Sequence, residues 1–247
     1  FVVDTKHKIV LCQVPKAAGS FWRTMFVKGT GELDEDEEED FNVHRQNELK
    51  EIGLEFLHKF DPTKQERILS TYLKVMTVRH PMDRAVSAYI DKFVASKLRD
   101  PIIKCIDHIN KNYRDEKSQI KLNKGINTIP SGVTIQDFVN LALDPTSPYN
   151  PHWDMAFNLC HPCAIQYDYV IRTETIAEDA KYILDILSQG LDAPLELEIV
   201  HTRSNNTVDD VVDPTFAKVI ESFEKIPKYQ LEQLKEVYKH DMEAFGY

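Results

Sequence analysis

The chain has 247 residues, enough for one large domain or two small ones, and 42% of them are hydrophobic, so a sizeable core is available. The formal net charge of −10 argues against general binding of nucleic acid. No apolar run reaches the length of a membrane-spanning helix. The start at Phe1, without Met or a secretory signal, favours the ordered part of a longer protein.

Strands and helices alternate in the predicted elements. The apolar run "KIVLCQV" predicts a strand over 8–14, then a loop over 15–19 and a helix from near Ser20. Periodicity and capping signals predict further helices over 46–60, 134–143 and 173–190 and after Pro81, strands over 72–79 and 164–172, and a mostly helical C-terminal third. Residues 100–130 are expected to be irregular. This order predicts an α/β fold with a mainly parallel sheet flanked by helices, whose ligands bind at the carboxyl ends of the strands.

The segment "VPKAAGSFWRT" at 14–24 has the composition of an anion-binding loop. Its small residues let successive backbone N–H groups converge on one anion, and the following helix directs its positive end to the same place. Lys16 adds a mobile charge and Ser20 a hydroxyl donor. The ATP-binding pattern G-x-x-x-x-G-K-[ST] is absent, because here the lysine precedes the single glycine. The alternative is an ordinary strand-to-helix turn with a solvated lysine.

A second candidate site lies in "VRHPMDRAVSAY" at 78–89. Arg79 ends a predicted strand, Ser87 lies in the following helix, and Arg84 falls one turn before Ser87. A guanidinium fork and a hydroxyl group are suited to a second phosphate. The alternative is a surface arginine and a serine that faces its own helix.

Together the two segments resemble the nucleotide-binding motifs of sulfotransferases that use 3′-phosphoadenosine-5′-phosphosulfate (PAPS). The chain is most similar to Golgi carbohydrate sulfotransferases of the chondroitin/dermatan 4-O-sulfotransferase type. The likeness rests on "VPK" followed by Trp-Arg at 14–23, on "VR-x-P…R-x-VSAY" at 78–89, on "HWD…CHPC…YDYV…ET" at 152–175 and on the closing "FGY". These blocks span nearly the whole chain, so the resemblance implies one sulfotransferase domain over 1–247, with a P-loop-like fold.

The resemblance implies roles for individual residues. The 5′-phosphosulfate would be held by Pro15, Lys16, Ala17, Ala18, Gly19, Ser20 and Phe21. Arg79 and Ser87 would hold the 3′-phosphate, with Arg84 near them. Sulfuryl transfer is governed by positioning and charge stabilisation, so Lys16 would neutralise the leaving phosphate oxygen. No metal is needed.

Two histidines compete for the role of general base, which takes the proton of the acceptor hydroxyl. His44 lies between the two motifs, where related sulfotransferases carry their base, and is the first choice. His152, in "PHWD", is the other. Together with Trp153 it could instead line the sugar site.

The expected acceptor is an anionic glycosaminoglycan of the chondroitin type, sulfated at the 4-O position. The segment 92–124 has nine basic and four acidic residues and could steer such a polyanion, or could be a solvated loop. The resemblance also implies the lumenal Golgi domain of a single-pass type II membrane protein. A non-catalytic glycan-binding relative and a P-loop kinase-like enzyme are the alternatives to this function.

The four cysteines allow several arrangements. Cys12, in the first predicted strand, is most simply a buried free thiol. Cys160 and Cys163 form a C-x-x-C pair without a second pair at zinc spacing, so a metal site is not expected. A disulfide from Cys105 to one of this pair is plausible in an oxidising compartment.

Overall fold

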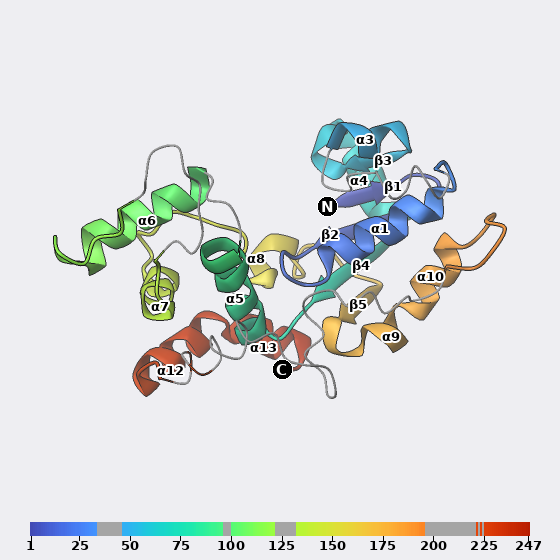
Figure 1. Ribbon diagram of the computed structural model, residues 1–247. Helices are drawn as coiled ribbons and strands as arrows, with labels where there is room; N and C mark the ends of the chain where they lie inside the picture. Colours follow the sequence, from blue (N-terminus) through green and yellow to red (C-terminus); the bar gives the residue numbers. More distant parts are fainter. Residues whose placement is uncertain (34–45, 96–99, 122–131, 196–220, 222, 224) are drawn as a thin grey trace. The chain divides into compact units, whose positions relative to one another are not determined.

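The computed structural model describes residues 1–33, 46–95, 100–121, 132–195, 221, 223 and 225–247. The chain forms two compact units, and the elements of each are labelled in Figure 1. Unit 1 comprises residues 1–79 and 156–203, and unit 2 comprises residues 80–155 and 204–247. Each unit has a hydrophobic core of its own. A single domain over 1–247 therefore stays a prediction.

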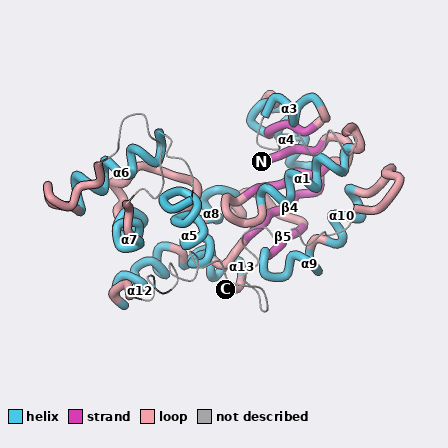
Figure 2. Tube along the Cα trace, viewed as in Figure 1, coloured by secondary structure: helices cyan, strands magenta, loops and turns pink. Residues whose placement is uncertain are grey.

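Unit 1 is built on a five-stranded sheet in the order β3-β1-β2-β4-β5 (Figure 2). The strands are β1 (Val2–Asp4), β2 (Ile9–Gln13), β3 (Leu54–Phe56), β4 (Leu73–Val78) and β5 (Tyr169–Arg172). β2, β4 and β5 are parallel neighbours, whereas β1 runs antiparallel to both β2 and β3. The predicted α/β fold is confirmed, and the antiparallel half of the sheet is an addition that the sequence pattern did not indicate.

Side-chain alternation along β2 divides the helices of unit 1 between two faces of the sheet. Ile9 and Leu11 pack in one cluster with residues of α1 (Gly19–Thr30) and α10 (Lys181–Leu187). Val10 packs in another cluster with Ile68 of α4 (Pro62–Thr71). Cys12 shares the direction of Val10 and reaches α8 (Ala156–Cys160). Helices therefore cover both faces of β2, which holds the strand and its outgoing loop in place.

The structure corrects several predicted elements. The 46–60 segment is a short helix, α3 (Gln46–Glu51), followed by β3 and a 3-10 turn (Leu57–Lys59). Gly53 has a φ of 82°, which is incompatible with continuing the helix. The residues after it form β3, which pairs with β1 although their apolar residues are spaced as in a helix. The strand expected over 164–172 begins only at Tyr169. The helix expected over 173–190 is divided into a 3-10 turn (Thr173–Thr175), α9 (Ile176–Asp179) and α10.

Unit 2 contains helices and loops, with no strand among its described residues (Figure 2). Its elements are α5 (Pro81–Tyr89), a π-helical turn (Ile90–Ala95), α6 (Asp100–Tyr113), α7 (Ile135–Leu143), α12 (Lys228–Val237) and α13 (Lys239–Phe245). The predicted start of α5 at Pro81 and the capping box of α7 between Thr134 and Asp137 are confirmed. The prediction that residues 100–130 are irregular is wrong over α6. There, Ile102, Ile106 and Ile109 form an apolar stripe at helical spacing that packs in the core.

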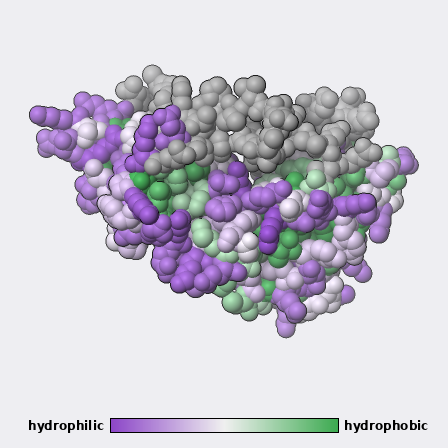
Figure 3. Space-filling view, turned by 90° about the horizontal axis from the view of Figure 1, so that it is seen from below, coloured by the Kyte–Doolittle hydropathy of each residue, from purple (hydrophilic) through white to green (hydrophobic). Residues whose placement is uncertain are grey.

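The surface of the described residues is mixed in character. Hydrophilic side chains alternate with smaller apolar areas on the face drawn in Figure 3. No helix in the described part of the chain combines the length and the apolar character needed to span a bilayer.

Candidate functional site

The loop after β2 has an unusual backbone. Lys16 and Ala18 both adopt positive φ, 69° and 57°, which side-chain-bearing residues rarely do. The N–H of Ala17 donates to the carbonyl of Val14 at 3.2 Å, and Ala17 is fully buried. Strained backbone of this kind is concentrated at ligand sites, and alternation between left- and right-handed residues turns successive N–H groups toward one side.

The helix that follows presents an uncapped N-terminus. Ala18 occupies the N-cap of α1 and offers no side-chain hydrogen bond to the first turn. The backbone N–H groups at the start of a helix then require another acceptor, and the helix dipole favours an anion there. Beyond its chain neighbours and the backbone of its own helix, a Cβ atom built on Gly19 would meet nothing within 4 Å. The first turn of α1 therefore offers N–H donors beside open space.

The side chains of Gln13, Arg23 and Trp22 hold the loop and the start of α1 in place. Gln13, the last residue of β2, donates from Nε2 to the carbonyl of Gly19 at 3.3 Å and accepts from Nε of Arg23 at 2.8 Å. Trp22 is fully buried, with its ring edge-on to that of Phe21 at 5.2 Å. Gln13 is not among the residues predicted for the site, although a polar residue at the end of an apolar strand is a signal that could have indicated it. Trp22 anchors α1 in the core.

Arg79 lies beside this loop. It follows β4 directly, and parallel pairing places the carboxyl ends of β2 and β4 at the same edge of the sheet. The guanidinium donates to the carbonyl of Lys16 at 3.5 Å, and the residue is only 9% exposed. The structure thus brings two predicted residues, Lys16 and Arg79, together with the N-terminus of α1 and Ser20. This is a concentration of positive charge and N–H donors.

A disulfide joins the strand before the loop to α8. Cys12 bonds to Cys160, with 5.9 Å between the Cα atoms. The prediction of a free Cys12 is therefore wrong, because Cys12 faces the side of the sheet that α8 covers. The proposed pairing of Cys105 is also wrong. Cys105 is a buried free thiol whose pKa burial raises to about 11, and Cys163 is free and exposed.

Arg84, in unit 2, is almost completely buried. Its guanidinium donates to the backbone carbonyls of His152, at 3.2 Å, and Asp154, and lies 3.8 Å from the carboxylate of Asp241. It also lies over the ring of Tyr238, 5.8 Å from the centroid. These contacts differ from the predicted phosphate contact and give Arg84 a structural role in holding the loop that carries His152. Ser87 is half-buried on the same helix, and its predicted role stays a prediction.

His152 has a defined tautomer. The side-chain oxygen of Asn150 accepts the backbone N–H of His152 at 3.0 Å, which fixes which end of the amide is the oxygen. The same oxygen lies 2.7 Å from Nδ1 of His152. Nδ1 must therefore carry the proton, and in the neutral ring Nε2 is the basic nitrogen. This is the form that a general base requires, and Asn150 was not indicated by the sequence pattern.

Other predicted residues have different outcomes. Trp153 is 7% exposed and packs against the rings of Phe93 and Phe138, and its place in a sugar site stays a prediction. His44 lies outside the described residues. Within the basic segment 92–124, Lys92 pairs with Asp91 and Arg114 with Asp137. No cluster of potential metal ligands occurs among the residues that the structure describes.

Comparison with known proteins gives a consistent result. The profile described as "Sulfotransferase family" matches residues 1–247. The chain is 31% identical to carbohydrate sulfotransferase 11 of Mus musculus over 252 residues, which cover 100% of this chain and 66% of that protein. It is 32% identical to carbohydrate sulfotransferase 9 of Homo sapiens, over 99% of this chain and 52% of that protein. The chain thus spans slightly less than two thirds of the first of these relatives. No solved structure matches it significantly.

Proposed function

The chain belongs to the Sulfotransferase family, and we propose that it transfers a sulfuryl group from PAPS to a hydroxyl group of a glycan. The observation that carries the proposal is the uncapped, positively charged loop over 14–21 with Arg79 beside it. Family membership implies a sulfate donor, and the loop has the donors and charge that a phosphosulfate group needs.

We assign the two ends of the donor to different groups. Lys16 and the backbone N–H groups of 17–21 hold the 5′-phosphosulfate. Arg79 holds the 3′-phosphate together with Ser87. Arg79 as a residue is only 9% exposed, so its interaction with a phosphate is weakly screened by water.

The reaction follows from this placement. The acceptor oxygen forms a bond to sulfur while the bond from sulfur to the leaving phosphate oxygen breaks, in line with the attack. The acceptor hydroxyl gives its proton to a histidine. Negative charge grows on the leaving oxygen, where Lys16 and the N-terminus of α1 stabilise it. The released nucleotide is 3′-phosphoadenosine-5′-phosphate (PAP).

The acceptor class is supported by the relatives. The names of both relatives reported above identify them as carbohydrate sulfotransferases. Within that class we propose an anionic glycosaminoglycan of the chondroitin type, sulfated at the 4-O position, and a place in the Golgi lumen behind a single membrane anchor. These finer assignments rest on the sequence motifs.

Nucleotide binding tests the proposal. PAP should raise the melting temperature of the protein, by the equivalent of about 2.7 kcal/mol at a hundredfold excess over its dissociation constant. ATP at the same concentration should give little shift, because the loop lacks the triphosphate pattern. A shift with ATP and none with PAP would contradict the proposal and favour a kinase-like enzyme.

The choice between the two candidate bases can be decided by mutation. If His152 is the base, Asn150→Ala should lower kcat about 3- to 10-fold with little change in the KM values, because the ring loses the hydrogen bond that sets its tautomer. Asn150→Asp keeps an acceptor and should remain active. His152→Ala and His44→Ala, measured beside these variants, complete the comparison. Full activity of both His152→Ala and Asn150→Ala would assign the base to His44.

A further inference from the structure

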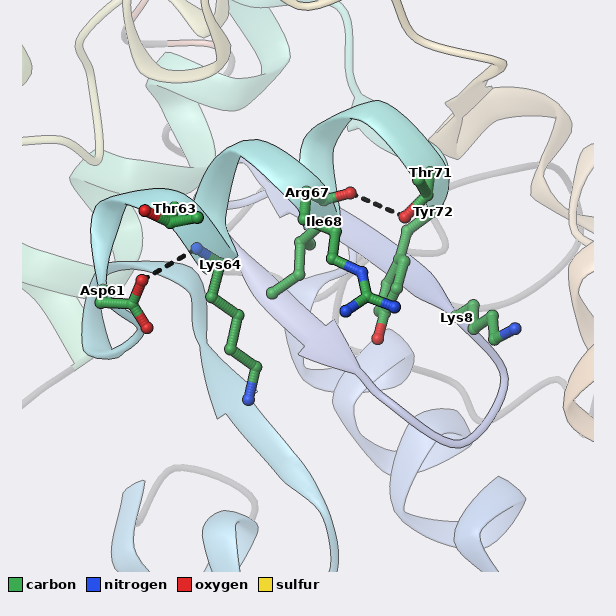
Figure 4. Close-up of a pocket in the computed structure, with 8 residues that line it drawn as sticks. All are labelled: Lys8, Asp61, Thr63, Lys64, Arg67, Ile68, Thr71 and Tyr72. Carbon is green, nitrogen blue, oxygen red and sulfur yellow. Dashed lines mark hydrogen bonds between the residues drawn. The ribbon is translucent and has the colours of Figure 1, made fainter.

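A groove in unit 1 lies between α4 and the turn that joins β1 to β2 (Figure 4). Its volume is about 650 Å³, within the range of about 300–1,000 Å³ that is usual for ligand sites. Asp61, Lys64 and Arg67 of the α4 segment line one side of the groove, and Lys8 of the turn also lines it. The proposed donor and base sites include none of these residues.

Both walls of the groove are held by the fold. The carbonyl of Lys8 accepts the backbone N–H of Leu73 at 2.9 Å, which ties the turn to the start of β4. On the other wall, Asp61 caps α4 by accepting the backbone N–H of Lys64 at 3.0 Å. Ile68, 2% exposed, packs α4 against the sheet in one cluster with Val3 and Val10. The groove is therefore a preformed feature.

The charge of the groove has the opposite sign to that of the chain. Lys8, Lys64 and Arg67 are exposed, and none of them makes an ion pair with a residue that the structure describes. The acid in the lining, Asp61, is engaged at the N-terminus of α4. Lys64 and Arg67 are three residues apart, and Figure 4 shows their side chains leaving α4 on the same side. A cluster of cations on a chain with a net charge of −10 is complementary to a polyanion.

The lining also suits a sugar. Tyr72 and Thr63 contribute hydroxyl groups, and the ammonium of Lys64 lies 4.3 Å from the centroid of the Phe60 ring. Lysine and arginine are the usual partners of sulfate and carboxylate groups, and hydroxyl groups are suited to the oxygens of a sugar ring.

The position of the groove separates it from the donor. Lys8 precedes β2 and Leu73 begins β4, so the groove lies at the amino ends of these strands, whereas the donor loop follows their carboxyl ends. The five residues of β2 span roughly 16 Å, at about 3.3 Å per residue. The groove and the donor loop are therefore separated by the length of β2.

We propose that this groove is a second binding site for an anionic, sulfated glycan chain, separate from the site of transfer. The proposal rests on the proposed function, because its occupant is the polymer that the transfer site modifies. A chain that contacts both sites gains affinity from the second contact without new interactions at the first. Long acceptors should therefore bind more tightly than short ones.

The test compares two triple variants that remove the same charge. K8Q/K64Q/R67Q changes the groove, and K225Q/K235Q/K239Q removes three exposed cations of unit 2, each paired with a nearby glutamate. The probe is a fluorescently labelled chondroitin sulfate polymer, and its binding is measured by anisotropy in a Lys16→Ala background. We expect the groove variant to raise the dissociation constant about tenfold or more, because three exposed charge contacts are lost, and the control to change it little.

Further measurements separate the two proposals. PAP binding and transfer to a short chondroitin oligosaccharide should be equal in wild type and in the groove variant with Lys16 intact. If wild type binds no PAP and transfers no sulfate, the proposed function fails whatever the polymer does. Equal polymer binding by the two triple variants would overturn the groove as a glycan site. The glycan site would also be overturned if the groove variant had its affinity for inorganic sulfate or PAP weakened as much as its affinity for the polymer. That result would indicate a site for small anions.

Discussion

Replacing Lys16 by alanine is expected to lower kcat for sulfate transfer about 100- to 1,000-fold, the range found when one preorganised stabiliser of transition-state charge is removed. Charge on the leaving oxygen exists mainly in the transition state, so kcat should fall more than the donor KM rises. Initial rates with labelled PAPS at several donor concentrations measure both quantities.

Lys181→Ala is a suitable control for this variant. Lys181 is exposed at the start of α10, also in unit 1, and should retain full activity. The melting temperature of Lys16→Ala should stay near that of wild type, because Lys16 is half-buried in a loop and not part of either core cluster of the sheet. A Lys16→Ala protein that transfers sulfate at the wild-type rate would contradict the assignment of this lysine.

Replacing Arg84 by methionine is expected to lower the free energy of unfolding by about 3–5 kcal/mol, the usual cost of removing one partner from a buried ion pair. The substitution leaves the carboxylate of Asp241 buried without its cation, and the carbonyls of His152 and Asp154 without their donor. Chemical denaturation measures the change. Lys235→Met, which breaks an exposed pair with Glu232, should change stability far less.

The same variant distinguishes two roles for Arg84. If the guanidinium only supports the loop around His152, the folded Arg84→Met protein should bind PAP with nearly the wild-type dissociation constant. If Arg84 is instead a phosphate ligand, as predicted, the Arg84→Met protein should have the stability of wild type and an affinity for PAP that is at least tenfold weaker. Titration of PAP well below the melting temperature separates these results.

Several elements could be predicted because their signals are local. β4 is an apolar run bounded by polar residues, α5 begins at Pro81, and the capping box of α7 lies within four residues. β1 and β3 could not be predicted in this way. Each has only three residues, too few for a period to be recognised, and the two pair with each other across about 50 residues of sequence, while β1 also pairs with the nearby β2. The helical spacing in 46–60 was real, but the pairing of β3 with β1 determined the outcome.

The candidate site was partly predictable for a similar reason. Loops that follow parallel strands meet at one edge of a sheet, which is sufficient to bring Lys16 and Arg79 together. The disulfide between Cys12 and Cys160 spans 148 residues and depends on which face of β2 α8 covers, which the sequence does not encode locally. The hydrogen bond that Nδ1 of His152 donates to the side-chain oxygen of Asn150 depends on the side-chain conformations of a loop without periodicity.

The proposed function is tested most directly by measuring the transfer of labelled sulfate from PAPS to chondroitin, dermatan, heparosan and a glycan that ends in glucuronic acid. Wild type and Lys16→Ala are assayed side by side. We expect wild type to transfer sulfate to chondroitin and Lys16→Ala to lose that transfer. Absence of transfer to every acceptor, together with no stabilisation by PAP, would contradict the proposed function.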